Sequence, residues 1–210
     1  MKIIIIDGPD NTGKNTIIHN IIDRYDSVKI IHCHKPGDLI IDPLREMTRV
    51  YYKYADDTIT DYKNRTVDAV VFNRFYIGEW VYGQLYRNEN PADIKTVIFT
   101  IEQFLLSNIC YEDIYYIQLM SSSPELLKKY DDGRSLSEAE MDKIFRELVL
   151  FREGYSMSSL KKKTIYVNDH DSFRPKQEIT DEVNDFISDG YDDNKCPNTV
   201  FTRGTQKVAC

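Results

Sequence analysis

Residues 3–16 read Ile3-Ile4-Ile5-Ile6-Asp7-Gly8-Pro9-Asp10-Asn11-Thr12-Gly13-Lys14-Asn15-Thr16, and this stretch decides the fold. It matches the pattern G-x-x-x-x-G-K-[ST] from Gly8 through Lys14, with Asn15 where serine or threonine is usual. The glycines of this pattern let backbone N–H groups point inward at the start of a helix, which creates a site for an anion. The stretch therefore predicts a loop that binds the phosphate groups of a nucleotide.

The residues on either side of the loop provide the context that this pattern needs. Residues 2–6 are one lysine and four isoleucines, as expected for a central parallel strand that is buried on both faces. From Lys14 onward, isoleucines recur at helical spacing. A glycine-rich turn that binds no ligand would also join a strand to a helix, but the combined context favours the phosphate-binding interpretation.

The loop residues have separate expected roles. We expect Lys14 to reach the β and γ phosphates of ATP. The hydroxyl that usually follows this lysine holds Mg²⁺, and here Thr16 comes one position late. The predicted ATP-binding residues are Gly8, Asn11, Thr12, Gly13, Lys14, Asn15 and Thr16, and the predicted Mg²⁺ ligands are Asn15, Thr16 and Asp10.

Length and composition limit the class of protein. The chain has 210 residues, 41% hydrophobic and 29% charged, which fits one globular α/β domain. A formal net charge of −7 argues against general binding of nucleic acid, which usually needs a basic surface. The first residues form a strand and not a signal peptide, and no apolar run is long enough to span a membrane. We therefore expect a cytoplasmic protein, in the host cytoplasm if it is viral.

The four cysteines form no C-x-x-C pair and no zinc spacing with the histidines, which predicts reduced thiols. His32 and His34 flank Cys33 and could indicate a metal. A strand end with polar side chains near the site is the favoured explanation of this triplet.

Hydrophobic patterns predict strands that alternate with helices. The expected strands are 2–6, 28–34, 69–72, 114–119 and 164–167. The expected helices cover 43–64, 78–87, 90–109, 137–155 and 177–188, and two more begin at residues 14 and 123. The fold class is therefore α/β, with a five-stranded parallel sheet and helices on both faces. We expect one domain at 1–188 and an irregular tail at 189–210.

The third expected strand ends at Asn73-Arg74-Phe75, where open α/β sheets place ligand-binding residues. Residues 72–87 resemble the D-R-[FYH] segment of thymidylate kinases, and more closely the form D-R-F-x-x-G-E-x-V-Y-G of thymidylate kinase-like proteins of bacteriophages. The phosphate loop is also similar to theirs, including the aspartate at position 10. The matching residues of the segment are Arg74, Phe75, Gly78, Glu79, Val81, Tyr82 and Gly83.

A third resemblance lies at residues 131–137, which look like the mobile lid of these kinases, with the helix after it ending in Phe151-Arg152-Glu153-Gly154-Tyr155. We expect the lid at about 128–137, and the resemblance covers residues 3 to about 167. It implies a P-loop kinase fold that uses ATP and Mg²⁺ on nucleotide substrates, without nucleic acid or membrane partners. A homodimer is also compatible with the resemblance.

Phosphoryl transfer requires the protein to align two polyanions and neutralise their charge. Arg74 is expected to clamp the acceptor phosphate, since a guanidinium binds phosphate through two hydrogen bonds. Arg134 is expected to approach the transferring group from the lid. The predicted catalytic residues are Lys14, Arg74, Arg134 and Asp10, and the predicted acceptor-binding residues are Asp10, Arg74, Phe75, Glu79 and Tyr82.

Simpler roles stay open for several of these residues. Arg74 could neutralise Asp7 or Asp10 across the strand ends, and Arg134 could be an exposed loop residue. Aromatic residues at helical spacing are more often part of a core than stacked on a base. Glu79 could pair with a basic residue or accept a hydrogen bond from the acceptor sugar.

Two positions depart from the family pattern. Asn73 replaces the acidic residue before the arginine, and Asn15 replaces the hydroxyl residue after the lysine. An asparagine oxygen can ligate Mg²⁺, so Asn15 or Thr16 could serve, with Asp10 and Asp7 as the nearest acidic groups.

The leading hypothesis is transfer of the γ-phosphate of ATP to a deoxynucleoside monophosphate, namely thymidylate or a related pyrimidine nucleotide. One alternative is a deoxynucleoside kinase, which needs a general base for the 5′-hydroxyl, and Asp7 or Glu79 could supply it. The other alternative is a nucleotide-binding protein with little turnover, which the two asparagines would explain.

Overall fold

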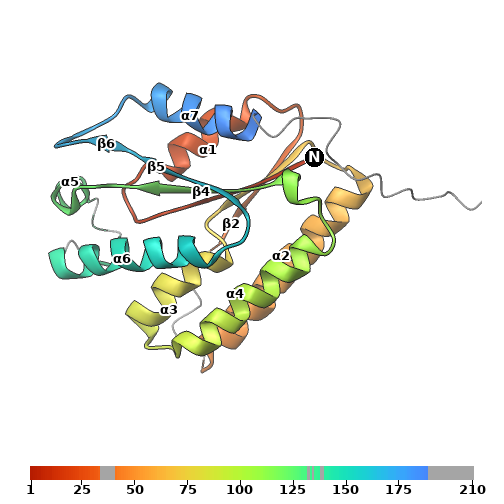
Figure 1. The fold of residues 1–210 in the computed structure, drawn as a ribbon, viewed down its shortest axis with the longest axis horizontal. Coiled ribbons are helices and arrows are strands. Elements are labelled where there is room, and N and C mark those ends of the chain that lie inside the picture. Colours follow the sequence, from red (N-terminus) through yellow and green to blue (C-terminus); the bar gives the residue numbers. More distant parts are fainter. Residues whose placement is uncertain (34–40, 132, 134, 138–139, 189–210) are drawn as a thin grey trace, which may run out of the picture.

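The computed structural model describes residues 1–33, 41–131, 133, 135–137 and 140–188. Its main sheet is parallel, with the strand order β2-β3-β1-β4-β5. These strands are β1 (Lys2–Asp7), β2 (Val28–His32), β3 (Ala69–Asn73), β4 (Ile114–Met120) and β5 (Lys161–Tyr166). Helices cover both faces of the sheet (Figure 1), which confirms the predicted α/β fold.

The helices form two layers. On one face of the sheet, α1 (Lys14–Ile22) packs beside α7 (Lys176–Ser188). The other face carries α2 (Pro43–Asn64), α3 (Glu79–Arg87), α4 (Pro91–Leu106) and α6 (Met141–Met157), with α2 against α4 and α3 against α6. Short elements complete the fold: the 3₁₀ turns η1 (Tyr76–Gly78) and η2 (Tyr111–Asp113), and helix α5 (Pro124–Lys129).

Strand β1 lies at the centre of the sheet, and its side chains alternate between the two faces. Ile3 and Ile5 pack toward the layer of α2 and α4, whereas Ile4 and Ile6 pack toward α1 and α7. All four are fully buried, and each contributes roughly 1.5–3 kcal/mol of transfer free energy. This double burial holds the phosphate loop, which follows β1 directly, on a rigid strand.

Some predicted boundaries were wrong. The helix expected from residue 137 begins at Met141, and the N–H of Glu140, just before it, donates to the carbonyl of Ser137. The strand expected at 164–167 begins at Lys161, since its three lysines reach partners at the edge of the sheet. The strand expected to reach residue 34 ends at His32, which pairs with the last residue of β3.

Other segments add to the predicted picture. A small antiparallel hairpin of β6 (Asn168–Asp169) and β7 (Ser172–Phe173) was not predicted. Lys128 and Lys129, expected in the lid, lie at the end of α5. Arg134 and the expected tail at 189–210 lie outside the described residues.

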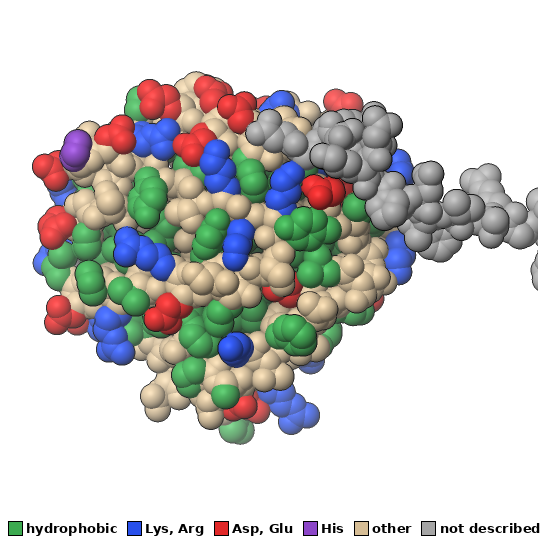
Figure 2. Space-filling model, viewed as in Figure 1, with side chains coloured by type: hydrophobic (Ala, Val, Ile, Leu, Met, Phe, Trp, Pro, Cys, Tyr) green, Lys and Arg blue, Asp and Glu red, His purple; other side chains and the backbone are tan. Residues whose placement is uncertain are grey.

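The surface of the described part has mixed charge. On the face shown in Figure 2, lysine and arginine side chains are scattered among acidic and hydrophobic ones. Among the described helices, none is both long enough and apolar enough to cross a membrane.

Candidate active site

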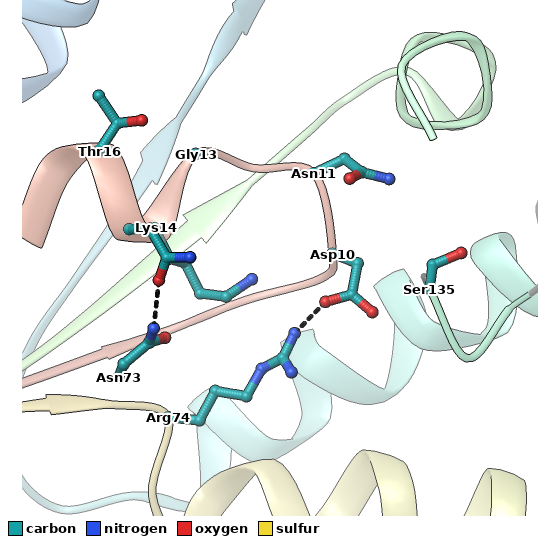
Figure 3. A pocket seen from close by; sticks show the side chains of 9 residues that line it. Asp10, Asn11, Gly13, Lys14, Thr16, Asn73, Arg74 and Ser135 are labelled. Carbon is teal, nitrogen blue, oxygen red and sulfur yellow. Dashed lines mark hydrogen bonds and ion pairs between the residues drawn. The ribbon is translucent and has the colours of Figure 1, made fainter. Parts of the chain in front are cut away.

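A pocket of about 380 Å³ opens at the carboxyl ends of the central strands, beside the start of α1. This is the edge at which open parallel sheets bind ligands. The pocket brings together most of the predicted loop residues, together with residues from the end of β3 and from the segment before α6 (Figure 3). Its lining consists of Asp10, Asn11, Gly13, Lys14, Asn15, Thr16, Asn73, Arg74 and Ser135.

The backbone of the phosphate loop requires glycine at its first position. Gly8 has a φ of +140°, and a Cβ there would lie 2.1 Å from the carbonyl oxygen of Leu119 on β4. Gly13 has a φ of +79° and forms the N-cap of α1. Between them, the hydroxyl of Thr12 donates to the carbonyl of Pro9 at 2.9 Å, which closes the turn. The loop thus places the N-terminus of α1, with its partial positive charge, at the pocket.

Lys14 is buried and folded back over the loop. Its Nζ donates to the carbonyl oxygens of Gly8 at 3.0 Å and Pro9 at 2.5 Å. Burial and the positive charge of Arg74 lower the pKa of Lys14 to about 7. The negative charges of a phosphate chain would stabilise the ammonium, so the side chain is poised to exchange carbonyl partners for phosphate oxygens.

Arg74 and Asp10 form an ion pair across the pocket (Figure 3). Arg74 follows β3 with a φ of 64°, and its guanidinium lies 4.9 Å from the centre of the Tyr82 ring. Burial opposes ionisation of Asp10, but the charges of Arg74 and Lys14 outweigh it and lower the pKa of this carboxyl group. The simpler role considered for Arg74, neutralisation of Asp10, is therefore present in this structure.

The three residues predicted to hold Mg²⁺ have different surroundings in the structure. The carboxylate of Asp10 forms an ion pair with Arg74 and accepts from the backbone N–H of Leu136. Thr16 lies on the first turn of α1, well separated from Asp10 in Figure 3. Asn15 does fit, because its amide oxygen lies at the edge of the pocket and accepts a hydrogen bond from Asn73.

The side chains next to Asn15 are an amide and an imidazole. The Nδ2 of Asn73 also lies 3.2 Å from Nδ1 of His32, so the side chains of α1, β3 and β2 meet at this edge. In the part of the chain that the structure describes, no group of three histidine, cysteine or acidic residues could hold a metal ion. Asn15 and Asn73 both line the pocket, and amide oxygens are groups that a cation brought by a nucleotide could contact.

A smaller cavity of about 60 Å³ lies on the other side of Arg74. Besides Arg74, three predicted acceptor-binding residues line it: Phe75, Glu79 and Tyr82. Phe75 belongs largely to the core, since only 1% of it is exposed and its ring stacks on Phe72 at 4.0 Å. The hydroxyl of Tyr82 is buried and has no hydrogen-bond partner among the described residues.

Glu79 is part of a buried ionic network at this cavity. Its carboxylate forms an ion pair with Arg87 and accepts a hydrogen bond from the hydroxyl of Tyr51 at 2.7 Å. Arg87 also contacts Glu89 at 3.0 Å. Of the two roles considered for Glu79, the structure contains the pairing with a basic residue.

Ser135 and Leu136, between α5 and α6, each line one of the two cavities. Ser135 lines the larger cavity. Its hydroxyl donates a hydrogen bond to the carboxylate of Asp131 and lies 3.1 Å from the hydroxyl of Ser137. Leu136 lines the smaller cavity. Both residues belong to the expected lid at 128–137, whose Arg134 lies outside the described residues.

Two buried acids lie near the site. The sequence did not identify Glu147 as a functional candidate and left the role of Asp7 open. Glu147 on α6 is 2% exposed and accepts a hydrogen bond from the hydroxyl of Tyr86. Burial raises its pKa to about 7, and the negative charge of Asp10 adds to this effect. An acidic residue among the apolar positions of the inner helix face was the available signal.

The second buried acid is Asp7, at the end of β1. Its Oδ1 accepts the N–H of Gly8 at 2.9 Å, while Oδ2 has no hydrogen-bond partner among the described residues. Burial raises the pKa of Asp7 to about 6 despite the nearby charge of Arg74. Asp7 is fully enclosed, so it supports the loop from below and does not line the pocket.

Comparison of the sequence with protein-family models finds no match, and comparison with curated proteins finds none either. Solved structures do match. YorR from Bacillus subtilis, solved in complex with phosphorylated GDP, has a TM-score of 0.63 at 20% identity, covering 89% of this chain and 96% of that chain.

Two further kinases have related structures. Thymidylate kinase from Ehrlichia chaffeensis has a TM-score of 0.52 at 15% identity, covering 87% of this chain and 96% of that one. Deoxyadenosine kinase from M. mycoides with bound dATP has a TM-score of 0.51 at 13% identity, and the match covers 89% of this chain and 99% of that chain. Similarity at this level of identity concerns the fold. The chain therefore has the fold of P-loop nucleotide and nucleoside kinases, with its phosphate loop and Arg74 at one pocket.

Proposed function

We propose that this protein is a nucleoside monophosphate kinase that transfers the γ-phosphate of ATP to a deoxynucleoside monophosphate, namely thymidylate or a related pyrimidine nucleotide. The observation that carries the proposal is the position of Arg74, which lies between a phosphate-loop pocket and a second cavity with aromatic walls. A site that joins two phosphorylated substrates needs a cation at this boundary.

The larger pocket is the proposed donor half. Lys14 would exchange the carbonyls of Gly8 and Pro9 for the β and γ phosphates of ATP. Asn15 and Asn73 would hold Mg²⁺ through their amide oxygens, and the bound ion would neutralise part of the phosphate charge. The protein's own task in this half is to align the phosphate chain and exclude water.

The smaller cavity is the proposed acceptor half. Arg74 would bind the acceptor phosphate, either beside Asp10 or in place of it. Tyr82 contributes a ring beside the guanidinium and a buried hydroxyl. Because the cavity is only about 60 Å³ and Leu136 lines it, the segment 135–137 must withdraw before an acceptor enters. This segment would then close over the two substrates, and the proposed role of Arg134 is to neutralise charge on the transferring group.

The acceptor class follows from the groups that could act as a base. A nucleoside kinase needs a group that accepts the proton of the 5′-hydroxyl, whereas a monophosphate is already an anion. Glu79 is engaged by Arg87 and Tyr51, and Asp7 is enclosed beneath the loop. These contacts favour the monophosphate over the nucleoside as acceptor.

The test is an acceptor scan. The purified protein is incubated with ATP and Mg²⁺ and with thymidine, dTMP, dUMP, dCMP, dAMP or dGMP, and the formation of ADP and of the phosphorylated acceptor is followed. We expect a diphosphate product from a pyrimidine monophosphate. ADP formed only with thymidine would establish the nucleoside kinase. Tight ATP binding without turnover on any acceptor, with Mg²⁺ or Mn²⁺, would establish the binding protein.

A further inference from the structure

Two amides and an imidazole meet where P-loop kinases of the resembled family have a hydroxyl and an acid. Asn15 stands on the first turn of α1, Asn73 ends β3, and His32 ends β2. His32 and Asn73 are direct register partners in the parallel pair of β2 and β3. The sheet therefore fixes the two side chains next to each other at the edge of the large pocket.

The hydrogen bonds of this group determine the orientation of the Asn73 amide. Its Nδ2 donates to Oδ1 of Asn15 and lies 3.2 Å from Nδ1 of His32. An asparagine amide has two N–H donors, so two acceptors account for both of them. His32 accepts at Nδ1 only when it is neutral and carries its proton on Nε2.

This orientation matters because the two ends of an amide have opposite polarity. With both N–H groups of Asn73 directed to Asn15 and His32, its Oδ1 is the remaining polar atom of the side chain on the pocket lining. A flipped amide would present an NH₂ group to a cation, which is unfavourable. Asn15 keeps a second lone pair on Oδ1 beside the one that Asn73 uses.

We propose that His32 is a positioning residue for the nucleotide's divalent cation. As the Nε2–H tautomer it fixes the Asn73 amide, and through it Asn15, so that amide oxygens replace the hydroxyl and the acid at this edge. The inference rests on the proposed function, since the cation enters with the phosphate chain. The ligand class is a divalent cation carried by a nucleoside triphosphate and bound without a protein carboxylate.

The first test reads the tautomer directly. Nitrogen NMR of uniformly ¹⁵N-labelled protein, with the His32 signals assigned by their loss in His32→Asn, reports which ring nitrogen carries the proton. We expect the neutral ring of the ligand-free protein to carry its proton on Nε2 and to accept at Nδ1. A proton on Nδ1 of the neutral ring would overturn the proposal, whatever the protein does with nucleotides.

The second test compares two substitutions of similar size. His32→Asn places an amide oxygen near the former Nδ1 and can accept from Asn73, whereas His32→Leu cannot. The affinity of the non-hydrolysable analogue β,γ-imido-ATP is measured by calorimetry with Mg²⁺ and in EDTA. We expect His32→Leu to lower the Mg²⁺-bound affinity about tenfold, as outer-shell substitutions do, while the affinity in EDTA is unchanged. His32→Asn should restore the Mg²⁺ effect.

The control is His19→Leu, which removes an exposed histidine from α1. It should behave like the wild type in both conditions. Equal Mg²⁺ effects in His32→Leu and in the wild type would refute the positioning role. If the wild type bound no nucleotide in either condition, the proposed function would fail instead, and the tautomer measurement would still decide the state of His32.

Discussion

Replacement of Glu147 by glutamine should stabilise the protein in a pH-dependent way. Glu147 is 2% exposed on α6, and its carboxylate accepts the hydroxyl of Tyr86. Glutamine has nearly the same shape and keeps an oxygen that can accept this hydrogen bond, but it has no charge to bury. Glu147→Gln therefore isolates the free energy of placing a negative charge at this position.

The magnitude follows from the pKa. Burial raises the pKa of Glu147 from 4.5 to about 7, so the native state holds a proton that the unfolded chain releases in this range. Stability accordingly falls as the pH rises from 4.5 to about 7. The full cost above pH 7 is about 3 kcal/mol, because each pH unit between the two pKa values corresponds to about 1.4 kcal/mol. Below pH 4.5 this cost is absent.

The assay is urea unfolding of the wild type and the variant at pH 5, 6, 7 and 8. We expect Glu147→Gln to exceed the stability of the wild type by only about 1 kcal/mol at pH 5, and by about 3 kcal/mol at pH 8. The control is Glu153→Gln on the same helix, since Glu153 is exposed and accepts from Trp80 at 3.1 Å. A stability difference that does not grow between pH 5 and pH 8 would refute the buried charge at position 147.

Three further substitutions test other contacts. Gly8→Ala should cost about 3 kcal/mol, since its Cβ would collide with the carbonyl of β4 at a φ that alanine rarely adopts, and urea unfolding measures this loss. Arg87→Met leaves the buried Glu79 without its cation and should cost about 3–5 kcal/mol, and a second change, Glu79→Gln, should recover much of it. Unchanged unfolding midpoints would contradict both expectations. Asn73→Asp and Asn15→Thr should be coupled by about 1 kcal/mol in a double-mutant cycle of Mg²⁺-ATP affinity, whereas additive effects would contradict the hydrogen bond between these side chains.

The parts of the site that the sequence predicts come from local patterns. The phosphate loop lies between a buried strand and an amphipathic helix, and Arg74 follows the next central strand. Parallel strands end at the same edge of a sheet, so both groups of residues meet there by topology. The predicted fold and the meeting of Lys14 with Arg74 need no knowledge of distant contacts.

Contacts between distant helices could not be predicted in the same way. Glu147 and Tyr86 are 61 positions apart and meet because α6 packs on α3. The ion pair of Glu79 with Arg87 joins the first and last residues of one short helix, a spacing that does not predict contact on its own. Strand β5 begins three residues earlier than predicted, because its first residues are lysines, and charged residues interrupt the apolar pattern from which a strand is predicted.

The two asparagines that interrupt the family pattern depend on each other. Asn15 can accept from position 73 only if that position carries an N–H donor, and an aspartate there would face it with another acceptor. An aspartate would also face the acceptor nitrogen of a neutral His32, so the histidine would need a proton on Nδ1. The three residues therefore form one alternative set of contacts. Two losses that look independent along the sequence become, in the folded protein, a single neutral arrangement at the edge of the phosphate site.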